Sequence, residues 1–141
     1  CGIHLRFTSI LGDFDEAVNK PLPDEQKQLL IASCVQAVSQ LIQQEKFQQF
    51  LVVSDSGTFL NTLKQIPANT FGNKLLLVPP GKIGHVDVHY DDEVLEKSVL
   101  DFYLLSQCKK IIQVKAKQMY NSQYSKYAAI TGDAEYILHK I

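Results

Sequence analysis

The chain has 141 residues, of which 45% are hydrophobic and 21% charged, and its formal net charge is −1. This composition is ordinary for one globular domain with its own core. A nearly neutral chain offers no basic field to nucleic acid and no polybasic patch to a membrane surface, and it contains no run of about 18 apolar residues that could cross a bilayer. We therefore expect a single domain over residues 1–141, with no nucleic-acid partner and no membrane span.

The three cysteines, Cys1, Cys34 and Cys108, are widely spaced and form no CxxC pair. An odd number of cysteines without a disulfide framework is typical of a reducing compartment. The composition therefore predicts a cytoplasmic location and free, structurally inert thiols.

The first half of the chain alternates apolar strand patterns with amphipathic helices. The apolar residues between positions 30 and 42 recur at the spacing of one helical face, whereas the run FLVV is typical of a buried parallel strand. We expect, in chain order, a strand over residues 2–8, a helix over 24–44, a strand over 50–53 and a helix over 57–65. Because a strand pattern begins at the first residues, we also expect the chain to be a piece of a longer protein.

The second half repeats the alternation. Its expected elements are a strand over residues 74–78, an irregular loop over 82–92, a helix over 93–107, a strand over 110–114, a helix over 122–130 and a short last element over 136–139. Regular alternation of strands and helices predicts the α/β class. The expected fold is a Rossmann-like open parallel sheet with helices on both faces.

In such sheets, ligands bind beyond the carboxyl ends of the strands, and the first strand ends in polar residues. His4 and Arg6 alternate with apolar neighbours, so both point to the same side of the strand. Arg6 is the only arginine beside thirteen lysines, and a guanidinium grips a phosphate with two parallel hydrogen bonds that an ammonium cannot make. Two alternatives stay open: Arg6 pairs with a nearby acid, and His4 is a core histidine.

Three further segments have both a structural and a functional interpretation. Ser54-Asp55-Ser56 caps the following helix or contacts a nucleotide. Asp101 forms a solvated ladder with Glu93 and Lys97, or it accepts N–H groups from a nucleobase. Ser122 caps the last long helix, or it adds a hydroxyl to the anion site at that helix N-terminus, where Ser125 could also contribute.

Several common signatures are absent from the sequence. There is no GxGxxG or GxxxxGK[ST] motif, no Gly-x-Ser-x-Gly elbow and no Cys–His pairing at a known spacing. His85, Asp87 and His89 alternate along HVDVH, but no further ligand group supports a metal there, so we expect no metal.

Four segments together resemble the fucosyltransferase superfamily that includes α1,2-, α1,6- and protein O-fucosyltransferases. GIHLRFTSILGD resembles the first motif, FLVVSDSGTFL the second, and KSVLDFYLLSQCKKIIQ with YNSQYSKYAA the third. The order and spacing agree over essentially the whole chain. The resemblance implies the donor-binding half of an enzyme of the glycosyltransferase-B type, whose two domains are both Rossmann-like.

The resemblance also implies roles for single residues. Arg6 would bind the β-phosphate of a GDP-sugar, with GDP-fucose the expected donor, and Asp101 would read the guanine. Ser122 would support the diphosphate, and His4 and Asp55 would lie on the base and ribose side.

The reaction that the resemblance implies is an inverting transfer to a hydroxyl of a glycan or other acceptor, without metal or cofactor. The catalytic base would be Asp13, with Asp15 and Glu16 as alternatives. Phe7 departs from the second basic residue that many relatives carry. An N-terminal acceptor-binding domain has no counterpart in these residues, so we expect the chain alone to bind donor without catalysing transfer.

One alternative belongs to a different class of protein. A non-catalytic module with a flavodoxin-like or receiver-like sheet also fits the alternation of elements. Asp13, Asp15 and Glu16 suit the acidic loop of a receiver, and Asp55 would be its phosphate acceptor.

Overall fold

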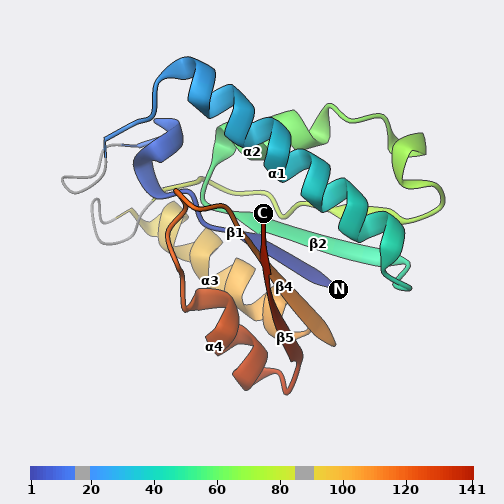
Figure 1. The fold of residues 1–141 in the computed structure, drawn as a ribbon. Helices are drawn as coiled ribbons and strands as arrows, with labels where there is room; N and C mark the ends of the chain where they lie inside the picture. The colour runs from blue at the N-terminus through green and yellow to red at the C-terminus, as the bar shows by residue number, and fades with distance from the viewer. Residues whose placement is uncertain (15–19, 85–90) are drawn as a thin grey trace.

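A computed structural model describes residues 1–14, 20–84 and 91–141 of the chain. Its centre is a sheet of five strands that are all parallel and follow the order β3-β2-β1-β4-β5 (Figure 1). The strands are β1 (Gly2–Leu5), β2 (Gln49–Ser54), β3 (Leu75–Leu77), β4 (Lys110–Lys115) and β5 (Glu135–Lys140). The α/β class and the open parallel sheet are confirmed.

Helices cover both faces of the sheet, as expected. On one face lie α1 (Asp24–Gln44) and α2 (Gly57–Lys64), and on the other lie α3 (Asp92–Ser106) and α4 (Tyr124–Thr131) (Figure 1). The core between the sheet and α1 and α2 is the larger of the two, and the core on the α3 and α4 face is small. Alternate residues of β2 and β4 enter different cores, because successive side chains point to opposite faces.

The strand register aligns the carboxyl ends of the three central strands. Leu5 of β1 pairs with Ser54 of β2 on one side and with Val114 of β4 on the other. The chain after β1 crosses to β2, and the chain after β3 returns to β4, so the direction of winding reverses between β1 and β4. This order is that of the Rossmann fold, and the reversal point is where such sheets bind ligands.

The structure corrects two of the sequence expectations. The first strand ends at Leu5 and not at Thr8, because a 3-10 helix, η1 (Thr8–Leu11), follows it and ends at Gly12 with φ of 82°. The sheet is not flavodoxin-like either, since that fold has strand order 2-1-3-4-5. The short last element is the parallel edge strand β5, and a second 3-10 helix, η2 (Ala68–Phe71), had not been expected.

The cysteines agree with a simpler expectation. Cys1, Cys34 and Cys108 are free thiols, and burial raises the pKa of the Cys34 thiol to about 12. Among the residues that the structure describes, no helix has the length and hydropathy that a transmembrane span requires.

Candidate functional site

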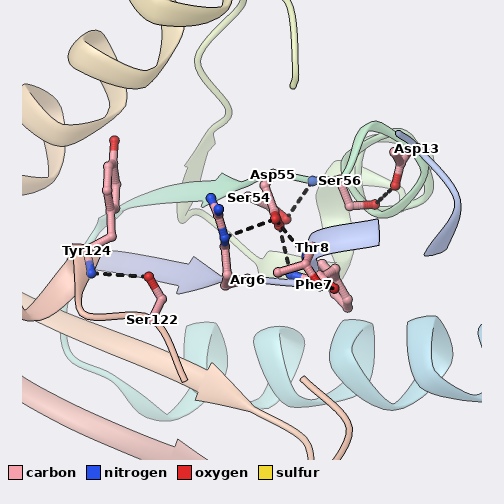
Figure 2. Close-up of polar contacts among 9 residues, drawn as sticks. All are labelled: Arg6, Phe7, Thr8, Asp13, Ser54, Asp55, Ser56, Ser122 and Tyr124. Atoms are coloured by element: carbon pink, nitrogen blue, oxygen red, sulfur yellow. Dashed lines mark hydrogen bonds and ion pairs between the residues drawn. The ribbon is translucent and has the colours of Figure 1, made fainter. Parts of the chain in front are cut away.

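The carboxyl ends of β1 and β2 are joined by an ion pair. Arg6 follows Leu5 and Asp55 follows Ser54, so the register of the two strands makes Arg6 and Asp55 neighbours. Arg6 Nε lies 3.2 Å from Asp55 Oδ2 (Figure 2). The outer nitrogens of the guanidinium point away from Asp55, and the Arg6 side chain is 21% exposed. The pairing with an acid therefore leaves donors of Arg6 open to solvent.

Asp55 also fixes the backbone after β1. Its Oδ1 accepts the Phe7 N–H at 2.7 Å and its Oδ2 accepts the Thr8 N–H at 2.8 Å. Thr8 has φ of 56°, a conformation that a β-branched residue adopts only when its surroundings impose it. Burial raises the pKa of the Asp55 carboxyl, whereas Arg6 and the two backbone N–H groups oppose that shift. The carboxylate thus stabilises a strained turn beside the guanidinium.

Next to this ion pair is a small pocket, which we call the carboxyl-end pocket. Its cavity volume is about 40 Å³, room for one or two water molecules. It lies on the α3 and α4 side of the sheet, and residues 82–84 form part of its wall. The lining side chains that carry a charge or a polar group are His4, Arg6, Ser54, Asp55, Lys82, Lys97, Ser98, Asp101 and Tyr124. Four predicted residues, His4, Arg6, Asp55 and Asp101, therefore meet at one place.

Three polar atoms of this pocket are buried and have no hydrogen-bond partner. Within the described part of the chain, the buried side-chain atoms without a hydrogen-bond partner are His4 Nδ1, Arg6 Nε and Asp101 Oδ1. Arg6 Nε is within ion-pair distance of Asp55, but its N–H is not aligned for a hydrogen bond to that carboxylate. Because buried polar groups are nearly always paired, three orphaned atoms around one cavity indicate a site for a polar ligand or for ordered water.

His4 is a neutral side chain in this setting. It is 3% exposed, and its ring stacks on Tyr124 with the centroids 5.4 Å apart. Burial, together with the positive charge of Arg6, lowers the pKa of His4 to about 3. At neutral pH the imidazole therefore has one donor and one acceptor nitrogen.

Lys97 and Asp101 form a buried ion pair on one face of α3. Lys97 Nζ contacts Asp101 Oδ2, and the two residues are only 6% and 5% exposed. The predicted pairing is present, but it is buried and faces the pocket, so the predicted solvated ladder is wrong. Burial raises the pKa of Asp101, and Lys97 opposes this shift. Removing one partner of such a buried pair costs about 3–5 kcal/mol.

Asp13 lies away from the pocket, at the N-terminus of α2. Its Oδ1 accepts the N–H of Thr58 at 2.9 Å and the Thr58 hydroxyl at 2.8 Å, and its Oδ2 accepts the Ser56 hydroxyl at 2.6 Å (Figure 2). Ser56 in turn caps the helix by accepting the Phe59 N–H at 3.0 Å. The geometry gives Asp13 a structural task, and its role as catalytic base stays a prediction. Asp15 and Glu16 lie outside the described residues.

Ser122 and Ser125 both lie near the start of α4, and neither lines the pocket. Ser122 Oγ accepts the Tyr124 N–H at 3.1 Å (Figure 2), and the buried Ser125 hydroxyl donates to Gln113 Oε1 at 3.1 Å. Ser122 therefore shapes the turn into α4. Its predicted contact with a diphosphate stays a prediction.

Sequence reasoning did not assign Tyr124 or Lys82 to the site. The Tyr124 hydroxyl donates to the Ser98 carbonyl, and its ring covers His4. Both contacts depend on how α4 packs against α3 and β1, and no local pattern encodes that packing. Lys82 pairs with Asp91 at 2.5 Å. It lines the pocket because the chain that follows β3 passes beside it. The spacing of Val94, Lys97 and Asp101 at i, i+3 and i+7 could have shown that one face of α3 lines the site.

A larger groove lies at the opposite end of the strands, and we call it the amino-end groove. Its volume is about 570 Å³, and it is lined by Cys1, Phe47, Gln48, Gln49, Leu51, Leu77, Leu104, Gln107, Cys108 and Lys109. None of the orphaned buried polar atoms lies there. The amino-end groove is therefore the larger candidate for a ligand site. The carboxyl-end pocket has the position in the fold where such sheets bind ligands, and it contains the unpaired polar atoms. The unpaired polar atoms make the carboxyl-end pocket the better candidate, because the specificity of a ligand site comes from a few precisely placed polar groups.

The described residues contain no group of three or more His, Cys, Asp or Glu side chains placed to hold a metal ion. His85, Asp87 and His89 fall outside the described ranges. Comparison of the chain with protein-family models gives no match, and comparison with curated proteins gives none either.

Proposed function

We propose that the chain is the donor-binding half of a fucosyltransferase-like glycosyltransferase of the B type, and that its ligand is a GDP-sugar such as GDP-fucose. The observation that carries this proposal is the position of Arg6. Its guanidinium stands at the carboxyl end of the central strand, beside the reversal point of the sheet, with its outer nitrogens directed away from Asp55. That is where an open α/β sheet binds phosphorylated ligands.

In the proposed complex, Arg6 neutralises the diphosphate. Asp55 supports this role by fixing Nε, so the guanidinium loses little side-chain freedom when a phosphate binds. Charge-assisted bonds from Arg6 would also stabilise GDP as it leaves, which accelerates transfer. The amides at the start of α4 are a second source of donors for the diphosphate.

The base would lie at the mouth of the carboxyl-end pocket. A whole purine is larger than a cavity of about 40 Å³, so only its polar edge enters. Asp101 Oδ1, which is buried and has no partner, is the acceptor for an N–H of that edge. A hydrogen bond to a charged group contributes about 1.5–3 kcal/mol.

The proposed transfer also needs an acceptor hydroxyl and a catalytic base. Asp13, Asp15 or Glu16 would take the proton of the hydroxyl while GDP leaves, without metal or cofactor. An acceptor-binding domain outside these residues would supply the second wall of the site. The chain alone would then bind donor and stay inactive.

The alternative, a non-catalytic nucleotide-binding or regulatory module, needs no acceptor domain. Its receiver-like form is disfavoured because both oxygens of Asp55 already accept backbone N–H groups and one of them faces Arg6. A phosphorylation assay with a small phosphodonor separates the two functions. A receiver gains a phosphoryl group, and the proposed donor-binding domain does not.

The direct test of the proposal is calorimetric titration of the chain with GDP and with UDP. We expect GDP to bind and UDP to bind much more weakly. Arg6→Lys keeps the charge but loses the paired donors, so GDP affinity should fall about 10- to 150-fold, equivalent to about 1.5–3 kcal/mol. Lys64→Gln, which removes an exposed positive charge at the end of α2, is the control and should leave the affinity unchanged. Equal GDP affinity in the wild type and Arg6→Lys would contradict the role of Arg6.

A further inference from the structure

The sheet ends at β5 in an edge strand of six residues, dark red in Figure 1. Within the described residues, β5 pairs with β4 along one side and with no strand along the other. The opposite edge strand, β3, has only three residues. An edge strand presents a row of N–H and C=O groups that a further strand can bind. β5 is therefore the longer of the two edges at which this sheet can be extended.

The hydrogen bonds to β4 determine which residues of β5 face outward. The Glu135 N–H donates to the Lys109 carbonyl at 3.1 Å, and the same pattern repeats at every second residue of a parallel pair. The odd-numbered residues of β5 therefore direct their backbone groups towards β4. The residues whose N–H and C=O groups point away from β4 are Tyr136, Leu138 and Lys140.

The side chains of β5 differ between the two faces of the sheet. Ile137 packs against the core under α1 and α2, whereas Tyr136 packs against the core under α3 and α4. Because side chains alternate along a strand, Glu135 and His139 share the face of Ile137, and Leu138 shares the face of Tyr136. A strand beside β5 would thus meet polar and apolar groups on one face and apolar groups on the other.

We propose that β5 binds the β5 strand of a second copy of the chain, antiparallel to it, about a two-fold axis at Ile137. An axis perpendicular to the sheet makes the contact self-complementary and keeps each face continuous from one copy to the next. Tyr136 then lies opposite Leu138 of the second copy, and the outward N–H and C=O groups of these two residues bond to each other. On the other face, Glu135 lies opposite His139 of the second copy.

The side chains of β5 favour this register over its neighbour. With the axis at Ile137, apolar side chains oppose apolar ones, and the Glu135 carboxylate opposes an imidazole that can donate an N–H to it. Moving the axis to Leu138 also keeps the faces continuous, but it places Glu135 opposite Ile141 and Ile137 opposite His139. Matched cross-strand pairs stabilise a sheet, so the axis lies at Ile137.

α4 supplies apolar surface beside the same edge. It contacts β5 (Figure 1), and two of its large side chains, Tyr127 and Ile130, are 59% and 66% exposed. A pair of strands alone is only marginally stable in water. Burial of apolar side chains next to the paired strands adds the stability that the association needs.

Sedimentation equilibrium of the 141-residue chain over a range of concentrations tests the proposal. Reducing buffer excludes dimers linked through the free thiols. We expect a reversible equilibrium between one chain and two. A chain that stays monomeric up to millimolar concentration would overturn the proposal.

Leu138→Pro removes an N–H that points away from β4, so the folded monomer keeps its bonds to β4. The proposed dimer loses one hydrogen bond in each copy, and we expect the dissociation constant to rise about tenfold or more. Circular dichroism checks that the variant is folded. An unchanged dissociation constant in the folded variant would place the contact elsewhere and overturn the proposal.

A charge swap tests the register without a proline. His139→Glu places two carboxylates opposite each other and should weaken the dimer about threefold or more. Adding Glu135→His to that variant restores a carboxylate opposite an imidazole and should recover the affinity. Lys64→Glu, at an exposed position at the end of α2, is the control and should leave the affinity unchanged. If the double variant binds no better than His139→Glu, the register is wrong. The swap also decides the question if Leu138→Pro does not fold.

Discussion

At the scale of single residues, Asp55 connects the fold to the candidate site. One carboxylate accepts two backbone N–H groups, imposes the positive φ of Thr8 and orients the only arginine of the chain. The sequence segment Ser54-Asp55-Ser56 predicts a helix cap, and Ser56 does cap α2. Asp55 instead binds residues 47 and 48 positions earlier in the chain, a contact that only the strand register determines.

Replacement of Asp55 by alanine tests this connection. Asp55→Ala leaves the Phe7 and Thr8 amides without their carboxylate and Arg6 without a counter-ion. We expect the free energy of unfolding to fall by about 3 kcal/mol, the low end for a buried pair because Arg6 is partly exposed. Urea denaturation measures this change. Glu96→Ala, an exposed acid of α3, should change the stability by less than about 0.5 kcal/mol. Equal effects of the two substitutions would contradict the account.

His4 makes stability depend on pH. Its pKa is about 3 in the folded protein, below the ordinary value of 6.5, because burial disfavours the charged ring. Below pH 6.5 the unfolded chain binds more protons at this residue, so stability is lost as pH falls from 6.5 towards 3. His4→Phe keeps an aromatic ring against Tyr124 and removes the titration.

The free energy of unfolding of the wild type, measured by urea denaturation at several pH values, should therefore fall more steeply than that of His4→Phe. The two slopes should differ by up to about 1.4 kcal/mol per pH unit. Arg6, Lys97 and Asp101 are present in both proteins, so their own effects largely cancel in the difference. Parallel curves would show that His4 is not buried in its neutral form.

At the scale of elements, local patterns predicted helices and strands well. The helix expected over residues 24–44 is α1 with the same bounds, since a long amphipathic period is a strong signal. The first strand was expected to be three residues too long, because the long-range contact with Asp55 turns the chain after Leu5. The edge strand β5 was not predicted as a strand, because its segment EYILHK mixes polar and apolar residues. Its side chains are half-buried or exposed.

The packing of α4 against α3 depends on a close backbone approach at Gly132. A Cβ atom at this position would lie 1.8 Å from the Ser106 carbonyl oxygen at the end of α3. Gly132→Ala should therefore force the two helices apart and lower the free energy of unfolding by about 3 kcal/mol, the upper range for overpacking. In Gly57→Ala, the matched control, the nearest atom to the new Cβ is 3.6 Å away.

Thermal and urea unfolding of both glycine variants measure the difference. Since Tyr124 of α4 lines the pocket, Gly132→Ala should also weaken GDP binding, whereas Gly57→Ala should not. A Gly132→Ala protein as stable as the wild type would mean that the helices are less closely packed than described.

At the scale of the whole molecule, the strand order determines where a ligand can bind. The alternation of elements predicts a parallel sheet with helices on both faces, but it does not distinguish the order β3-β2-β1-β4-β5 from a flavodoxin-like order. Only this order and its register bring His4, Arg6, Asp55 and Asp101 around one pocket. The sequence could name these residues, and it could not show that Lys97 occupies one oxygen of Asp101, since that depends on how α3 packs on the sheet.

We propose that a GDP-containing ligand binds at the carboxyl ends of the strands. The most direct measurement is a titration of the isotope-labelled chain with GDP, followed by amide NMR shifts. We expect shifts concentrated in residues 5–8, 54–56, 97–101 and 122–125, around the carboxyl-end pocket. Shifts gathered instead around Cys1, Leu51, Leu77 and Cys108, in the amino-end groove, would contradict it. No shifts at millimolar GDP would contradict it as well.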